Sequence, residues 1–434
     1  MPTFLAGAAE TVVTPPAEGT FLVGPMAPST GVHDDLWARA LVLSDGRERA
    51  AIVTLDYLGF DFAYNDVLVA AAAQASGIPP SHILINCSHS HSTPLTAPWG
   101  PWLKAKDQPF HALVPKKVSE VVGRAAAGLE PARLRYRRED VRIGANRRLP
   151  TPEKVTMAPN PRGPALPWTD VLAAERPDGG LIAALFSYAA HPVIIHATST
   201  LISADYPGFA VEALREARGP GGVYLFAQGC GGNVNALPLK GGLEAARAAG
   251  RTLGRAVGRA LAKPGEALPP GDLRVAASEL SLPLQDPPPA DDLRRRLADE
   301  SDPGRRARLD KLLVLAERGE RRSMRMPIRA LAIGDDLAIL ALGNEPFAEY
   351  ALWAAEVSPF KHTMVLGYTG GIACYVATAE DYRLGERGGY EASPRGAAAM
   401  YEAGLPLAPE AEDLVRQGIA AVLCDLAPPP VRGE

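Results

Sequence analysis

The chain has 434 residues, of which 47% are hydrophobic and 22% are charged, and its formal net charge is −4. This composition is typical of a globular chain with a sizeable core. It provides no basic surface of the kind that binds nucleic acid. No stretch approaches the roughly 18 apolar residues of a membrane-spanning helix, so we expect no membrane insertion. The four cysteines are scattered without a CxxC pair, and no signal peptide is recognisable, which favours a cytoplasmic protein.

Short apolar runs alternate with helical stretches along the chain, which predicts an α/β fold. The expected elements are, in chain order, a β-hairpin at 39–45 and 50–59, a helix at 66–76, a buried strand at 82–88, a helix at 114–129, a strand at 181–190, a helix at 209–217, a strand at 221–228, a helix at 243–262, a β-hairpin at 326–342 and a strand at 362–368. Residues 144–178 are rich in Pro and Asn and predict a long irregular loop.

Residues 285–325 differ in composition from the rest of the chain. They are dense in charge, carry Leu at helical spacing and are interrupted at Asp302-Pro303-Gly304, which predicts a solvent-exposed helical hairpin. We interpret it as an insertion without chemistry, the alternative being a lid or a partner-binding element. Because no linker or internal repeat is visible, residues 1–434 are expected to form a single domain.

Polar side chains follow the apolar strands directly. His89 and His91 follow the strand at 82–88, His191 follows the strand at 181–190, and Glu345 follows the hairpin at 326–342. Ligands of α/β proteins collect beyond the carboxyl ends of strands, and imidazole and carboxylate groups bind zinc. If strand geometry continued to residue 91, His89 and His91 would share one face. The alternatives are structural: histidines that hydrogen-bond the backbone at strand ends, and Glu345 as the acidic start of a helix.

A glycine-rich turn, QGCGGNVN, occupies residues 228–235 after another strand. It has neither the GK[ST] ending of a P-loop nor a GxSxG elbow, which disfavours phosphate binding and serine hydrolysis. Glycines allow backbone N–H groups to approach a ligand closely. We therefore expect a substrate-binding or oxyanion-binding turn that contributes Gln228, Asn233 and Asn235.

The order of the motifs along the chain resembles the catalytic domain of the neutral (non-lysosomal) ceramidases, from about residue 5 to residue 395. The motifs are GVHDDLWARALVL at 31–43, NRRLP at 146–150, FSYAAHP at 186–192, SADYPGFA at 203–210, FAQGCGGNVN at 226–235, GNEPF at 343–347 and YVATAEDY at 375–382. The resemblance implies mixed β-sheets flanked by helices, without the family's C-terminal immunoglobulin-like domain.

The resemblance also implies functional residues. The zinc ligands would be His89, His191, Glu345 and Tyr375. The catalytic residues would be His91, which faces the substrate beside the metal, and Tyr390, which stabilises the oxyanion. Substrate contacts would come from Arg148, with Arg147 as the alternative, and from His33. Asn233 and Asn235 stand where the family has an aspartate and a serine, and an asparagine can position a substrate but cannot be a nucleophile or base.

Motifs and resemblance together predict a Zn²⁺-dependent hydrolase that cleaves the amide bond of a small N-acyl or related compound with metal-activated water. One alternative is a zinc esterase or lactonase, because the same chemistry cleaves esters. The other is a catalytically idle relative that binds a metal and a ligand. Homo-oligomerisation is left open.

Overall fold

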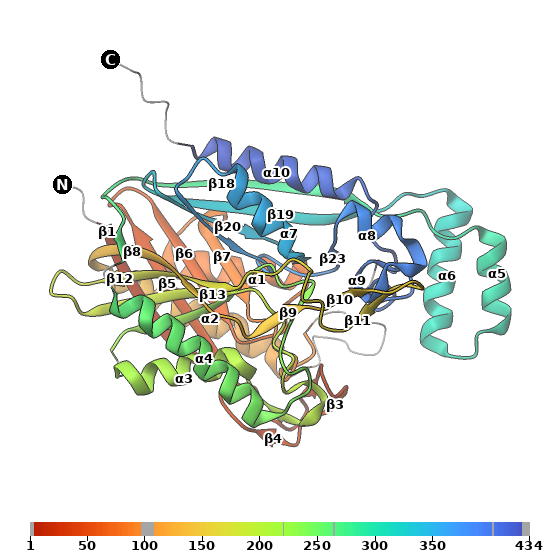
Figure 1. The fold of residues 1–434 in the computed structure, drawn as a ribbon, viewed down its shortest axis with the longest axis horizontal. Helices are drawn as coiled ribbons and strands as arrows, with labels where there is room; N and C mark the ends of the chain where they lie inside the picture. Colours follow the sequence, from red (N-terminus) through yellow and green to blue (C-terminus); the bar gives the residue numbers. More distant parts are fainter. Residues whose placement is uncertain (1–3, 97–107, 220, 264, 402, 428–434) are drawn as a thin grey trace, which may run out of the picture.

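The computed structural model describes residues 4–96, 108–219, 221–263, 265–401 and 403–427. Two β-sheets lie face to face, and helices cover both outer faces (Figure 1). Apolar side chains of both sheets share one core, in which Leu185 and Leu225 of one sheet belong with Ile339 and Met364 of the other. The mixed α/β fold expected from the sequence is confirmed.

The larger sheet has the strand order β15-β13-β12-β8-β1-β5-β6-β7, and β17 pairs with β8. Its strands are β1 (Phe4–Val12), β5 (Trp37–Ser44), β6 (Arg49–Leu55), β7 (Ile83–Cys87), β8 (Glu130–Asp140), β12 (Trp168–Glu175), β13 (Leu181–Tyr188), β15 (Val223–Gln228) and β17 (Glu266–Ala267). The pairs β6–β7 and β13–β15 are parallel. Each of these parallel pairs is joined through a crossover that contains a helix, α1 (Phe62–Ser76) for β6–β7 and α3 (Asp205–Arg218) for β13–β15.

The smaller sheet has the order β18-β19-β20-β22, comprising β18 (Leu273–Pro283), β19 (Ser323–Ile333), β20 (Leu337–Leu342) and β22 (His362–Leu366). Here β20 and β22 are parallel and the other pairs are antiparallel. The carboxyl ends of β7, β15 and β22 meet through contacts between the two sheets, where Asn86 donates to the carbonyls of Gln228 and Gly367.

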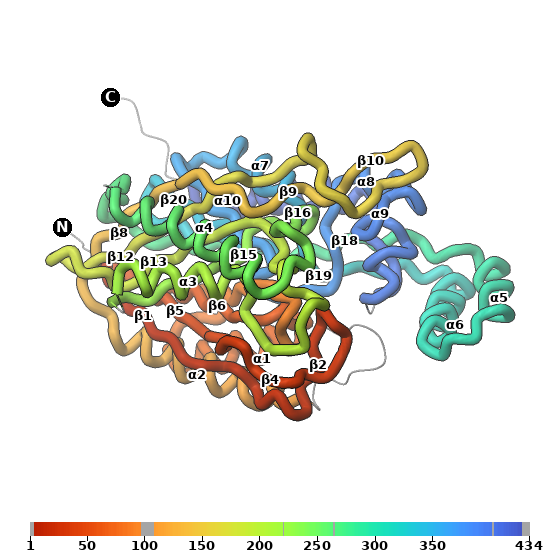
Figure 2. Tube along the Cα trace, turned by 60° about the horizontal axis from the view of Figure 1, so that its bottom comes forward, coloured from red at the N-terminus to blue at the C-terminus, as the bar shows by residue number. Residues whose placement is uncertain are grey.

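Helices α1 (Phe62–Ser76), α2 (Phe110–Ala127), α3 (Asp205–Arg218) and α4 (Leu243–Ala262) pack on the larger sheet. Helices α7 (Ala348–Val357) and α10 (Ala411–Asp425) cover the smaller sheet (Figure 2). Helix α1 begins four residues before the predicted start because Asp61 caps it by accepting from the Tyr64 N–H at 2.7 Å. In the described ranges, no helix has both the length and the apolar character needed to cross a bilayer.

Short elements surround the ends of the strands. They are β2 (Phe21–Leu22), β3 (Ala27–Pro28), β4 (Gly31–Val32), η1 (Pro80–His82), β9 (Gly144–Asn146), β10 (Arg148–Pro150), β11 (Val155–Met157), η3 (His196–Thr198), β14 (Leu201–Ile202), β16 (Val234–Ala236), β21 (Glu345–Pro346), β23 (Tyr375–Val376), α8 (Ala379–Arg383), η4 (Gly385–Arg387), α9 (Gly389–Ala392) and η5 (Ala397–Ala399).

Two helices, α5 (Ala290–Asp299) and α6 (Pro303–Arg318), form a hairpin that projects from one end of the molecule between β18 and β19 (Figure 1). The interruption lies where the sequence predicts it. Asp302 caps α6 by accepting from the Arg305 N–H at 2.8 Å, and Pro303 occupies the first helical position.

The predicted loop at 144–178 is wrong over much of its length. It contains the β10–β11 ribbon, and its end, Trp168–Glu175, is strand β12 inside the larger sheet. Strand β12 lies between β8 and β13. Its partner β8 carries charged residues that hide the apolar alternation, so only the tertiary pairing reveals either strand.

Candidate metal centre

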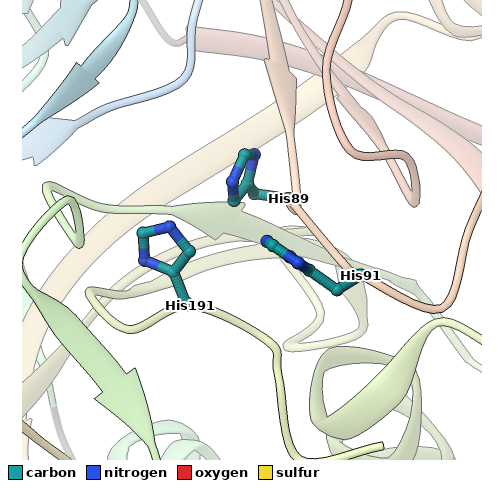
Figure 3. A group of neighbouring side chains, drawn as sticks. All are labelled: His89, His91 and His191. Carbon is teal, nitrogen blue, oxygen red and sulfur yellow. The ribbon is translucent and has the colours of Figure 1, made fainter. Parts of the chain in front are cut away.

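Three histidine side chains meet beyond the carboxyl ends of β7 and β13 (Figure 3). One ring nitrogen each of His89, His91 and His191 lies within 4.8 Å of the others, a group that could hold a metal ion. His89 and His191 are fully buried, whereas His91 is half-buried. His89 and His91 follow β7 and His191 follows β13, and the carboxyl ends of these two strands lie close together, which brings the three rings into one group.

The segment after β7 is a turn rather than a continued strand. Strand β7 ends at Cys87, and His89 has a φ of 64°, in the left-handed region that non-glycine residues rarely adopt. The turn nevertheless directs His89 and His91 to the same cluster, with ring centroids 5.1 Å apart. Backbone strain of this kind is concentrated at functional sites.

The imidazoles of His89 and His191 are held in one tautomer by backbone carbonyls. Nδ1 of His89 lies 2.6 Å from the Leu58 oxygen, and Nδ1 of His191 lies 2.7 Å from the Gly231 oxygen. Because a carbonyl only accepts, each Nδ1 carries the hydrogen and each Nε2 of a neutral ring carries a lone pair. In metal-binding histidines, the ring nitrogen that does not bind the metal usually donates a hydrogen bond in this way.

Both Nε2 atoms face one oxygen of Glu345, a fully buried carboxylate. Oε2 of Glu345 lies 3.3 Å from Nε2 of His89 and 3.1 Å from Nε2 of His191. Glu345 begins β21 after Asn344, whose φ of 60° turns the chain away from β20. Strand β21 pairs in parallel with β23, which places Tyr375 directly opposite Glu345.

Tyr375 completes the cluster. Its hydroxyl oxygen lies 3.3 Å from Nε2 of His191, and Nη2 of Arg147 donates to it at 3.1 Å. The guanidinium of the buried Arg147 also donates to Oδ1 of Asn235 at 2.9 Å and to Oε1 of Glu391 at 2.7 Å. One cation therefore ties the tyrosine to the asparagine of the glycine-rich turn.

The electrostatics favour a charged carboxylate at Glu345 and neutral rings at His91 and His191. Burial would raise the pKa of Glu345, but interactions with His89 and His191 hold it well below its ordinary value. Burial and the charge of Arg147 lower the pKa of His191 to about 3. Burial, and then the neighbouring His89, hold the pKa of His91 well below its ordinary value. Metal-binding side chains need these protonation states.

The two consecutive arginines of the NRRLP motif point to different partners. Arg147 contacts Tyr375 and Asn235, as described above. Arg148 instead donates to Oδ1 of Asp381 at 2.7 Å, to the Gly388 carbonyl at 2.9 Å and to Oε2 of Glu391. The structure therefore places Arg147, the alternative in the sequence analysis, against the cluster and Arg148 in an adjoining ion-pair network.

The predicted catalytic side chains lie beside the cluster. Tyr390 is half-buried, with its ring 5.9 Å from that of Tyr375 and 5.9 Å from the guanidinium carbon of Arg147. Asn235 is buried and forms an isolated parallel bridge with His191. His91 stacks on His196 at 5.3 Å between ring centroids, and its Nε2 is buried without a hydrogen-bond partner.

The other predicted substrate residues have partners within the protein. Asn233 accepts from the Ala348 N–H at 2.9 Å and donates to Glu349 at 2.7 Å, which joins the turn to α7. Gln228 donates to the Ala190 carbonyl at 2.8 Å, and its Oε1 is buried without a partner. His33 contacts Asp34 at 2.7 Å and the ring of Phe209, neither of which belongs to the histidine cluster.

The sequence analysis did not single out two tyrosines and one histidine that contact the metal-binding side chains. The buried ring of Tyr368 packs 4.4 Å from that of His89, and Tyr401 donates its hydroxyl hydrogen to Oε1 of Glu345. His196 lies against His91. Tyr368 ends the apolar run at 362–368 and could have been found by the strand-end rule, whereas no local signal marks Tyr401.

No protein-family model matches this chain, and no curated protein matches it either. Solved structures do match. The neutral ceramidase from Pseudomonas aeruginosa has 20% sequence identity and a TM-score of 0.74, over 100% of this chain and 76% of that chain. A ceramidase structure described as complexed with C2 has 18% identity and a TM-score of 0.73, over 98% of this chain and 75% of that chain.

The chain therefore has the fold of the neutral ceramidase catalytic region, as the motif order led us to expect. At this identity the likeness establishes the architecture, and function has to be argued from the site.

Proposed function

We propose that the chain is a zinc-dependent hydrolase that cleaves the C–N bond of a small N-acyl or related amide with water. One observation carries this proposal. The Nε2 lone pairs of two buried imidazoles, His89 and His191, face one oxygen of the buried Glu345 at 3.3 and 3.1 Å. Lone pairs of this kind repel unless a proton or a cation lies among them, and a buried carboxylate needs a counter-charge.

The side chains fit zinc. Ligand atoms on a tetrahedral zinc with bonds of about 2.0–2.1 Å lie about 3.3 Å from one another. The separations here are 3.1 and 3.3 Å from Glu345 to the two imidazoles, and 3.3 Å from His191 Nε2 to the Tyr375 hydroxyl. We therefore assign His89, His191, Glu345 and Tyr375 as the ligands.

A bound zinc would supply a water of lowered pKa and a positive charge that polarises the substrate carbonyl. His91 is assigned the proton transfers, because its Nε2 is buried without a partner and its ring is neutral. It accepts a proton at Nε2 from the attacking water and returns it to the leaving nitrogen. Amide and water thus give a carboxylic acid and an amine.

Asn235 and Tyr390 are assigned to the oxygen of the substrate carbonyl. Oδ1 of Asn235 already accepts from Arg147, so only its Nδ2–H groups are free to act on a substrate, as donors. Burial raises the pKa of Tyr390, which keeps its hydroxyl a neutral donor. Hydrogen-bond donors arranged in advance stabilise the negative charge that develops on that oxygen.

The two structural neighbours are named as ceramidases, so we extend the proposed substrate range to include lipid amides. Esters and lactones remain the second candidate class, because the same residues can act on them. A panel of matched amides, esters and lactones, including N-acyl sphingosines, separates these classes. Zinc binding without turnover of any panel member would instead support the alternative that the chain binds a metal and a ligand but is catalytically idle.

Metal analysis is the first test. The purified chain is expected to hold about one zinc per subunit, and chelation is expected to abolish hydrolysis in a manner that zinc reverses. His191→Ala should lose both zinc and turnover. His82→Ala serves as a matched control, because His82 also contacts a backbone carbonyl, that of Arg49, but lies outside the cluster. A chain that binds no zinc, or a His191→Ala variant that keeps it, would overturn the proposal.

A further inference from the structure

The two oxygens of the Glu345 carboxylate have different partners. Oε2 faces both imidazoles, at 3.3 Å from His89 and 3.1 Å from His191. Oε1 accepts the hydroxyl hydrogen of Tyr401. A carboxylate that is fixed through one oxygen presents the other in a defined direction, whereas one with both oxygens unconstrained can rotate or bind a metal through both.

Tyr401 is buried and comes from the connection between η5 and α10, far from Glu345 in sequence. Its backbone is held in a compact turn, with its N–H donating to the Ala397 carbonyl and its own carbonyl accepting from the Gly404 N–H at 3.1 Å. Its ring stands edge-on to Tyr375, with 6.3 Å between the ring centroids. The side chain therefore touches two of the four proposed ligands.

A single guanidinium group of the α5–α6 hairpin binds the chain on both sides of Tyr401. Nη2 of Arg308, in α6, donates to the Pro394 carbonyl at 3.0 Å and to the Gly404 carbonyl at 2.9 Å. These carbonyls flank Tyr401 in the chain. Gly404 has a φ of 72° and packs against α6, where a Cβ atom would lie 3.7 Å from the Leu312 side chain.

The hairpin is inserted where β18 and β19 would otherwise join directly. Pro283 of β18 pairs with Ser323 of β19, so the two strands are already adjacent where the hairpin leaves the sheet. Leu309 and Leu312 of α6 belong to the same apolar cluster as Ala403 and Leu405. The hairpin therefore buries an apolar face of α6, and Arg308 and Leu312 of this helix lie against Gly404 of the connection that carries Tyr401.

We propose that Tyr401 is a positioning residue that holds Glu345 with one oxygen toward the metal, and that Arg308 of the α5–α6 hairpin supports Tyr401 in this role. The inference rests on the proposed zinc site. It gives the charged insertion a function at the centre, although the insertion contributes no side chain to the metal cluster itself.

Zinc affinity, measured by competition with a chromophoric chelator, tests Tyr401. Tyr401→Phe keeps the ring and removes the hydroxyl, and it is expected to weaken zinc binding about 10- to 100-fold, as for outer partners of metal ligands. Tyr136→Phe is the matched control, because Tyr136 is also a buried tyrosine that donates to a carboxylate, that of Asp170. It is expected to bind zinc as the wild type does.

Two variants of α6 test whether Arg308 supports Tyr401. Arg308→Met should weaken zinc binding in the same direction as Tyr401→Phe but by less. Arg306→Met is the control, because Arg306 donates to the carbonyls of Leu297 and Glu300 within the hairpin. The double variant Tyr401→Phe/Arg308→Met should bind zinc no more weakly than Tyr401→Phe alone, since Arg308 acts through Tyr401.

The outcomes separate this inference from the proposed function. If the wild type binds zinc and Tyr401→Phe binds it equally well, the inference is wrong and the proposed function stands. If Arg308→Met and Tyr401→Phe weaken binding additively, the support by Arg308 is wrong. A wild-type chain without affinity for zinc overturns both proposals.

Discussion

The metal centre and the α5–α6 hairpin are both rich in ionisable groups, but those of the centre are buried and those of the hairpin are exposed to solvent. In the centre, His89, His191 and Glu345 are fully buried and meet at 3.1–3.3 Å. In the hairpin, Arg294 pairs with Asp291 and Glu317, and these side chains are 44–80% exposed. Water solvates the hairpin charges whether or not they pair, whereas the buried charges depend wholly on their neighbours.

The difference teaches that charge density in a sequence does not indicate function. The hairpin has the denser charge, and its exposed pairs contribute little to stability because solvent screens them. The centre has few charges, and losing one partner leaves the rest without compensation in a medium of low dielectric constant. Substitutions of equal chemistry should therefore have very different effects in the two regions.

The largest effect is expected at Glu345. Glu345→Gln removes a proposed ligand and the negative charge that faces both imidazoles, so zinc affinity should collapse and kcat/KM should fall by about 1,000-fold or more. Steady-state kinetics and metal analysis measure both quantities. The control is Glu356→Gln, on the exposed face of α7. Activity near the wild-type level in Glu345→Gln would show that Glu345 is not a metal ligand.

Glu391 offers the next largest effect, this time on stability. Its two oxygens accept from Arg147 and Arg148, and all three side chains are buried. Glu391→Gln leaves the buried Arg147 without its carboxylate partner, whereas Arg148 keeps Asp381, and it should lower the free energy of unfolding by about 3 kcal/mol. Urea denaturation measures it. Glu386→Gln, which breaks an exposed pair with Arg395, should leave the midpoint nearly unchanged. Equal losses in both variants would contradict the contrast between buried and exposed pairs.

Glu349 gives a smaller effect that depends on pH. Burial raises its pKa from the ordinary 4.5 to about 7, despite a hydrogen bond from Asn233. Between pH 4.5 and about pH 7, Glu349 holds a proton in the folded chain that it has lost in the unfolded chain. Its contribution therefore makes the free energy of unfolding fall as pH rises.

Glu349→Gln should therefore exceed the wild type in stability by about 1–2 kcal/mol at pH 8, with the difference vanishing toward pH 4.5. Chemical denaturation across this pH range measures the difference. Glu356→Gln, on the same helix, should show no such trend. A stability difference that grows toward acid pH would contradict the predicted direction of the pH dependence.

The smallest effect is expected in the hairpin. Arg295→Ala removes an exposed pair with Asp292 and should change neither the melting temperature nor zinc affinity measurably. Arg308→Met, on the facing helix, should change zinc affinity. If both variants behave alike, the hairpin acts through its overall charge rather than through the contact of Arg308 with the connection that carries Tyr401.

The sequence by itself determined the elements whose patterns are local. Helix α4 spans Leu243–Ala262, as predicted, and the break at Asp302 lies where expected, because helical periodicity and capping depend on neighbours in the chain. The rule that polar residues follow buried strands also brought His89, His191 and Glu345 into one hypothesis. The structure places these three together, because the strands that precede them direct their carboxyl ends to one place between the two packed sheets.

Only the tertiary structure decided what depends on contacts between distant segments. It placed β12 in the larger sheet through its pairing with β8 and β13, and it distinguished Arg147 from Arg148, which are adjacent in sequence but face different partners. It also brought Tyr401 to Glu345, 56 positions away in the chain. No local pattern encodes such a contact, because its free energy arises when packing excludes water from both partners, and packing is a property of the whole fold.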